Sequence, residues 1–186
     1  MTIRIAVIAG SLRRGAYSAA VAKYISEHAP ERFEMRAVPI GDMPLYNPDL
    51  EEGVDPPPSW TAFRNEIERS DGVLFVTPEY NRSIPAALKN ALDVGSRPPG
   101  KNMWGGKRAA IVSTSIGKVG GFGANHALRQ CSVNLDMRVM GLPEAYMGDL
   151  ADAVDPDGNI TDKRTADALN RFTAAFVAWI ERRDGV

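Results

Sequence analysis

The sequence predicts an α/β fold in which helices cover both faces of a parallel sheet. Strand-like and helix-like segments alternate along the whole chain, without internal repeats or low-complexity segments. Residues 72–76 are an apolar run, which is typical of a strand buried on both faces, and residues 3–9 are a β-branched run whose single charged residue is Arg4. A chain of 186 residues suits one domain with a substantial core. We therefore expect a single domain, residues 1–186, built as a three-layer sandwich.

Composition and charge narrow the possible function classes. The net charge is −1 and no basic run occurs, so we expect neither a nucleic-acid nor a membrane surface. No apolar stretch approaches the roughly 20 residues of a membrane-spanning helix, and the N-terminus has no signal-peptide pattern. Cys131 is the single cysteine, which excludes a disulfide framework and a thiolate metal cluster. We expect a cytoplasmic protein without a metal site.

The first third of the chain contains two strands and one helix. Residues 3–9 are rich in β-branched residues and are followed by Gly10, which predicts the first, central strand. The helix that follows is expected to end near His28. Residues 33–38 form the second strand, which Pro39 ends. Residues 40–58 are rich in proline and show no periodicity, which is typical of a functional cover or of an irregular connection.

The middle of the chain contains a second helix, a third strand and a third helix. Ser59 is expected to cap the second helix. The third strand, residues 72–76, is followed by Pro78, which has no N–H to give to a sheet. Ser83 is expected to cap the third helix, with Pro85 in its first turn. The apolar stripes of these helices are Trp60, Phe63 and Ile67, and then Ile84, Ala87, Leu88, Ala91 and Leu92.

The last third of the chain completes the sheet. Residues 108–113 form the fourth strand, which leads into a small, glycine-rich loop at 114–121. After a further helix, a short fifth strand is expected at 137–140. Residues 155–158 have the chemistry of a turn, and the last helix begins near Asp162. The apolar residues of these two helices are Leu128, Cys131 and Leu135, and then Leu169, Phe172, Phe176 and Ile180.

The strand order decides which loops meet. A five-stranded parallel sheet of order 2-1-3-4-5, the flavodoxin-like arrangement, brings together the loops at 10–18, 78–83 and 114–121. In open sheets of this kind, ligands bind at the carboxyl ends of the strands, beside the point where the strand order reverses. These three loops therefore form the predicted binding site.

The first of these loops has the features of a phosphate site. It leads into a helix, whose free N–H groups and dipole favour an anion. Ser11 and Ser18 add hydroxyl donors, and Arg13 adds a planar cation that suits phosphate.

Two familiar nucleotide motifs do not fit this loop. A dinucleotide fingerprint needs glycine two residues after Gly10, where this chain has Leu12. Gly10 and Gly15 have the spacing of a P-loop, but Ala16 and Tyr17 replace the lysine and the hydroxyl residue that such a loop needs. The loop therefore suits a terminal phosphate bound without a metal, which indicates a mononucleotide, and FMN is the common one.

The loops also resemble a known family. Residues 10–18 (GSLRRGAYS), 78–85 (PEYNRSIP) and 88–93 (LKNALD) closely resemble the NADPH-dependent FMN reductases, and the bacterial quinone/chromate reductases are the most similar branch. The resemblance covers nearly the whole chain. It implies a flavodoxin-like fold, bound FMN, NADPH or NADH as co-substrate, a small-molecule electron acceptor, and a homodimer or homotetramer.

The resemblance also implies roles for individual residues. Ser11, Arg13, Tyr17 and Ser18 would hold the FMN phosphate and ribityl chain. Pro78, Glu79, Tyr80 and Asn81 would line the isoalloxazine ring, with Ser83 in the same loop and with Ser115 and Gly117 on the far side. Tyr80, Asn81 and Arg82 would line the site of hydride transfer.

The chemistry expected at this site belongs to the flavin. Hydride passes through flavin N5 by ping-pong turnover, so no catalytic side chain is expected. The acceptors would be quinones, with azo, nitro or chromate compounds as further candidates. Two alternatives stay open, namely a flavin reductase that supplies free reduced FMN to a monooxygenase and a flavodoxin-type electron carrier. Arg82 and Lys118 could each contact an anionic substrate or be solvated surface cations.

Overall fold

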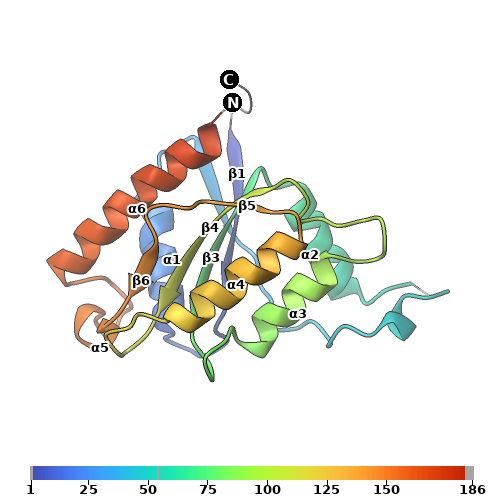
Figure 1. The fold of residues 1–186 in the computed structure, drawn as a ribbon, viewed down its shortest axis with the longest axis horizontal. Coiled ribbons are helices and arrows are strands. Elements are labelled where there is room, and N and C mark those ends of the chain that lie inside the picture. The colour runs from blue at the N-terminus through green and yellow to red at the C-terminus, as the bar shows by residue number, and fades with distance from the viewer. Residues whose placement is uncertain (1, 54, 183–186) are drawn as a thin grey trace.

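A computed structural model describes residues 2–53 and 55–182 and has the predicted three-layer α/β architecture (Figure 1). The strands run in the order β2-β1-β3-β4-β5, and neighbouring strands pair in parallel, so the flavodoxin-like prediction is confirmed. The strands on this path are β1 (Ile3–Ala9), β2 (Phe33–Ala37), β3 (Gly72–Pro78), β4 (Arg108–Thr114) and β5 (Arg138–Val139).

Two strands share the outer position of the sheet beside β4. The sequence prediction contained the first of them, β5, but not the second. The two-residue strand β5 pairs with the start of β4, and a further strand, β6 (Ala145–Met147), pairs with its end. The sheet formed by the described residues therefore has six strands. Pro143 lies between β5 and β6, and because proline has no N–H, the chain cannot continue one unbroken ladder there.

The helices divide between the two faces of the sheet (Figure 1). Apolar residues of α1 and α6 pack on one face, and those of α2, α3 and α4 pack on the other. The short helices η1 and α5 lie in connections. None of the described helices combines the length and the apolar composition that crossing a bilayer would need. The bounds are α1 (Tyr17–Glu27), η1 (Pro48–Leu50), α2 (Pro58–Glu68), α3 (Ala86–Gly95), α4 (Phe122–Asn134), α5 (Leu150–Ala153) and α6 (Lys163–Glu181).

Two predicted helix caps are wrong. Helix α3 begins at Ala86 with Pro85 at its N-cap, because Ser83 exchanges backbone hydrogen bonds with Tyr80 and stays extended. Pro85 also disfavours helical geometry at the residue before it. Helix α2 begins at Pro58, one residue before Ser59, since proline is well suited to the first helical position.

Residues 40–53 are fastened to the layer of α2 and α3. The Tyr46 N–H donates to Asn90 Oδ1 at 2.8 Å, and Trp60 Nε1 donates to the Pro44 carbonyl at 3.0 Å. The Arg64 guanidinium lies 2.9 Å from a Glu51 carboxylate oxygen, and both side chains are less than one-tenth exposed.

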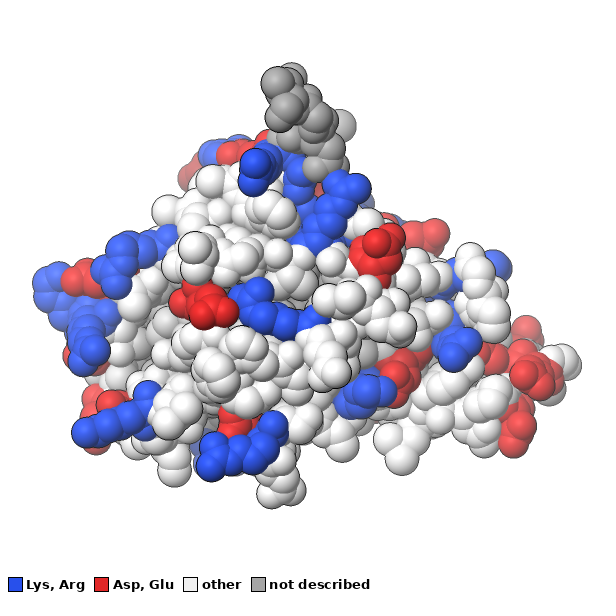
Figure 2. All heavy atoms as spheres, viewed as in Figure 1, with Lys and Arg blue, Asp and Glu red and all other residues white. Residues whose placement is uncertain are grey.

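Basic and acidic side chains are interspersed on the face of the molecule that Figure 2 shows.

Candidate functional site

The loops that follow β1, β3 and β4 meet around a hollow of ≈ 240 Å³ at the carboxyl ends of the strands. Eight of the eleven predicted cofactor residues line it, and the other three, Asn81, Ser83 and Gly117, do not. The lining residues are Ser11, Arg13, Ala16, Tyr17, Ser18, Pro78, Glu79, Tyr80, Thr114, Ser115 and Ile116.

The first wall is the loop that leads into α1. The N-cap residue Ala16 offers no side-chain acceptor, so no side chain caps the first amides of α1. The Arg13 guanidinium donates to the Gly15 carbonyl at 3.1 Å and lies 5.6 Å from the centre of the Tyr17 ring. This wall combines a cation with the positive end of a helix, as an anion site requires.

Ser18 provides a test of fit for a phosphate at this wall. Its side chain is 1% exposed, and its hydroxyl oxygen has no hydrogen-bond partner among the described residues. A buried hydroxyl without a partner is costly, and native proteins seldom leave one unpaired. Because Ser18 lines the hollow at the start of α1, a phosphate oxygen or a ribityl hydroxyl would satisfy it. The residues of this wall therefore fit a phosphate or a ribityl hydroxyl, both of which FMN carries.

The second wall is the turn that follows β3. The backbone groups of Tyr80 and Ser83 exchange hydrogen bonds of 2.9 and 3.0 Å. Asn81 and Arg82 form the tip of this turn with φ of 51° and 67°, the left-handed region that a two-residue turn uses. The hydrogen-bonded turn carries Asn81 and Ser83 beyond the lining of the hollow, whereas Pro78, Glu79 and Tyr80 stay in it.

Two contacts tie this turn to its neighbours. The Tyr80 hydroxyl lies 3.2 Å from Ser11 Oγ and joins the second wall to the first. The Glu79 carboxylate accepts a hydrogen bond of 3.1 Å from the Ala124 N–H at the start of α4.

The third wall is the end of β4. Thr114, Ser115 and Ile116 line the hollow here, whereas the sequence prediction named Ser115 and Gly117. Thr114 lies opposite Pro78 in the pairing of β3 with β4. Aligning these two strands in the sequence would have predicted Thr114 as a lining residue. Ser115 Oγ accepts from the Gly117 N–H at 3.0 Å, which folds Gly117 into the loop beyond the hollow.

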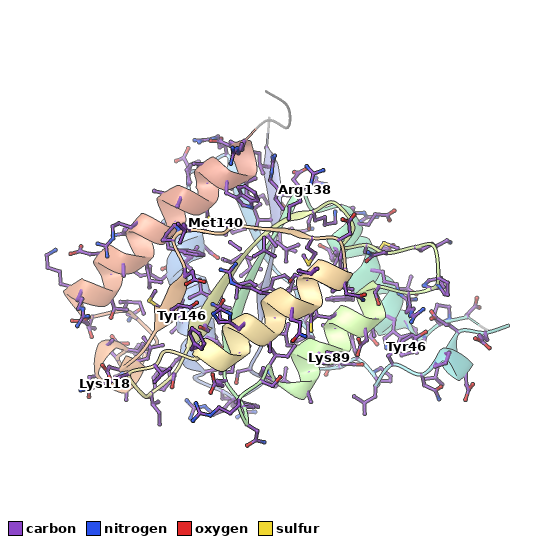
Figure 3. All side chains as sticks on the ribbon, in the orientation of Figure 1. Tyr46, Lys89, Lys118, Arg138, Met140 and Tyr146 are labelled. Carbon is purple, nitrogen blue, oxygen red and sulfur yellow. The ribbon has the colours of Figure 1, made fainter. Side chains whose placement is uncertain are left out.

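The surroundings of the hollow carry further polar groups. Lys118 and Tyr146 line a neighbouring hollow of ≈ 470 Å³, and Figure 3 shows both near α5 and β6. Burial, followed by a hydrogen bond with Glu144, raises the pKa of the Tyr146 phenol. The Tyr146 hydroxyl lies 3.0 Å from Nε2 of His126.

No three His, Cys, Asp or Glu side chains within residues 2–53 and 55–182 are grouped so that they could hold a metal ion.

Comparisons with known proteins agree with this geometry. The family model described as NADPH-dependent FMN reductase matches residues 3–152. A quinone reductase of Pseudomonas putida is 52% identical over 95% of this chain and 94% of that protein. A 2-hydroxy-1,4-benzoquinone reductase of a Burkholderia species is 42% identical over 98% of this chain and 99% of that protein. The solved structure of FerB, a flavoenzyme NAD(P)H:(acceptor) oxidoreductase from Paracoccus denitrificans, superimposes with a TM-score of 0.89 at 42% identity, covering 97% of this chain and 98% of that one.

Proposed function

This chain belongs to the NADPH-dependent FMN reductase family, and we propose that it binds FMN and reduces quinones with electrons from NADPH or NADH. The observation that carries the proposal is the unpartnered Ser18 hydroxyl, buried at the start of α1 where three loops converge. Relatives named quinone reductase, at 38–52% identity, support quinones as the class of acceptor.

The walls of the hollow would each hold one part of the cofactor. Ser11, Arg13, Tyr17 and Ser18 would bind the phosphate and the ribityl chain through hydroxyl, guanidinium and amide donors. Pro78, Glu79 and Tyr80 would lie along the ring, and Ser115 would close its far side. Asn81, Ser83 and Gly117 would act through loop shape, because they do not line the hollow.

Bound FMN would supply the redox chemistry, namely hydride transfer from the nicotinamide and delivery of electrons in pairs to the acceptor. The task of this chain is to orient the two substrates in turn at one exposed ring edge, in ping-pong order. Tyr80 lines the hollow and is 48% exposed, so its ring would be available to pack against a planar substrate. We extend the proposed acceptors to azo, nitro and chromate compounds.

An anaerobic titration tests the proposal. The protein is loaded with FMN, freed of excess cofactor, and titrated with NADPH or NADH while its visible spectrum is recorded. We expect bleaching to fully reduced flavin, reversed by adding a quinone. If neither nucleotide bleaches the flavin while dithionite yields a stable semiquinone, the protein is an electron carrier. If the protein does not retain FMN, the assignment of the first wall is wrong.

We also propose that the chain assembles as a homodimer or homotetramer, as its resemblance to the family implies. Light scattering during size-exclusion chromatography should give about two or four times the 20.2 kDa mass of one chain. A mass equal to one chain at micromolar concentration would contradict this.

A further inference from the structure

The Glu79 carboxylate is engaged by helix α4. Its Oε2 accepts the hydrogen bond from the Ala124 N–H, across 45 residues of sequence, and its side chain is only 17% exposed. Its Oε1 lies 3.6 Å from the guanidinium of Arg82, whose side chain is 86% exposed. An acid that lines the cofactor hollow therefore directs its charge toward a helix terminus and a loop cation of the same chain.

Helix α4 needs this acceptor. Its N-cap is Gly121 in the left-handed conformation, which offers no side chain, and its first turn contains no acid. The first amides of a helix have no partner within the helix, and a carboxylate is favoured there by the helix dipole. Glu79 supplies both the acceptor and the negative charge from the loop after β3.

Gly123 provides the space in which this contact is made. A Cβ atom at Gly123 would lie 2.9 Å from Glu79 Oε2 and 2.9 Å from the carbonyl oxygen of Arg82. The carboxylate could swing away, but the Arg82 oxygen belongs to the backbone, so the tip of the turn would have to move. The base and the tip of the 78–83 loop thus both rest against one glycine in the first turn of α4.

We propose that Glu79 and Gly123 are positioning residues for FMN. They fix the 78–83 loop against α4 so that Pro78 and Tyr80 line the hollow and the Tyr80 hydroxyl reaches Ser11. This inference rests on the proposed function, because it assigns to the two residues the alignment of a wall of the FMN site.

The first test uses the protein without cofactor. Hydrogen exchange resolved at the Ala124 amide is compared among the wild type, Glu79→Ala, Glu79→Gln and Gly123→Ala. We expect about tenfold faster exchange in Glu79→Ala and Gly123→Ala, because each loses the acceptor, and a smaller change in Glu79→Gln, which keeps a carbonyl acceptor. Exchange equal to that of the wild type in both Glu79→Ala and Gly123→Ala would overturn the proposed contact.

The second test measures the dissociation constant of FMN by quenching of flavin fluorescence. We expect Glu79→Ala and Gly123→Ala to bind FMN about tenfold more weakly, and Glu79→Gln to recover most of the affinity. Gly141→Ala is the matched glycine control, since nothing lies within 4 Å of a Cβ at that position, and Glu31→Gln is the matched acid control on an exposed residue. Wild-type affinity in Gly123→Ala would overturn the proposal.

Thermal unfolding separates positioning from general destabilisation. Alanine is a better helix former than glycine, but Gly123→Ala also loses the Glu79 acceptor and crowds the Arg82 carbonyl, so its unfolding temperature should fall slightly. Its FMN affinity should fall further than that of Gly95→Ala, a variant destabilised by overpacking away from the hollow. A loss of affinity that merely follows a loss of stability would overturn the positioning role. If the wild type itself binds no FMN, the proposed function fails, whereas the exchange experiment still reports on the contact between Glu79 and α4.

Discussion

Ser18 is the residue whose substitution should separate cofactor binding from stability. The change Ser18→Ala removes a buried hydroxyl that has no partner in the protein, so the unfolding temperature should stay level or rise. FMN affinity should fall about 10- to 100-fold, the usual range for a lost hydrogen bond to a charged group. Riboflavin, which lacks the phosphate, is the control ligand. Equal weakening of FMN and riboflavin would contradict a phosphate contact at Ser18.

Gly95 should be intolerant of any side chain, for a reason unrelated to backbone freedom. A Cβ there would lie 2.6–2.7 Å from ring atoms of Trp104, which is fully buried and donates a hydrogen bond to the Leu92 carbonyl. Gly95→Ala should therefore lower the free energy of unfolding by about 1–3 kcal/mol through overpacking. Urea denaturation measures this change. Gly141→Ala, which meets open space, should differ little from the wild type.

At the scale of elements, the segment 40–53 should matter for stability and not for the cofactor. Removing the Glu51 carboxylate leaves the buried Arg64 guanidinium without its anion, although Arg64 still donates to the Val94 carbonyl. Glu51→Ala should cost about 3–5 kcal/mol of unfolding free energy. FMN affinity should be unchanged, since the segment does not line the hollow. The exposed neighbour Glu52→Ala is the control, and a selective loss of FMN affinity in Glu51→Ala would make the segment a part of the site.

Helix α6 should give the protein an identifiable pH dependence. Asp162 caps the helix, and hydrogen bonds from the Thr165 hydroxyl and N–H, both 2.7 Å, lower its pKa from the ordinary 3.8. A lowered pKa contributes stability that is present above the unfolded pKa and is lost as pH falls through the folded pKa. Asp162→Asn keeps a cap that does not ionise. Its unfolding temperature should lie below that of the wild type near pH 5, and this difference should shrink as the pH is lowered to about 3. A difference that is constant over this range would contradict the charged cap.

The elements were predictable wherever their signal is local. Runs of apolar and β-branched residues predict the central strands, and the 3.6-residue stripe predicts α6, because both patterns are set by neighbours in sequence. Strand β6 was missed because it has only three residues, and its pairing depends on the free edge of β4. The cap at Ser83 failed for a similar reason. Its backbone was already engaged by Tyr80, a contact that the sequence does not reveal.

The site was predictable to the extent that topology determines it. Parallel strands end at one edge of the sheet, so the loops after β1, β3 and β4 had to meet once the strand order was known. The exact lining was not predictable, because it depends on the local turn. Positive φ at Asn81 and Arg82 carries the tip away from the hollow, and register brings Thr114 beside Pro78.

At the scale of the whole molecule, the sheet joins the two layers. Neighbouring residues of β1 belong to different cores, since Ile5 and Val7 pack with α1 and α6 while Ala6 and Ile8 pack with α2, α3 and α4. Each central strand thus contributes to both hydrophobic clusters, and neither layer keeps its core without the other. We therefore expect one cooperative unfolding transition.

The three tryptophans allow this prediction to be tested. Trp60 and Trp104 lie in the core beside α2 and α3, and Trp179 packs against the core beside α6. In Trp179→Phe, fluorescence reports on the first core alone, while far-UV circular dichroism also reports on α6, a helix of 19 residues. The two urea denaturation curves should superimpose, and FMN should move both midpoints upward together because it binds only the folded state. Two separated transitions would show that the layers unfold independently, and a midpoint shift confined to one probe would show that FMN stabilises one layer alone.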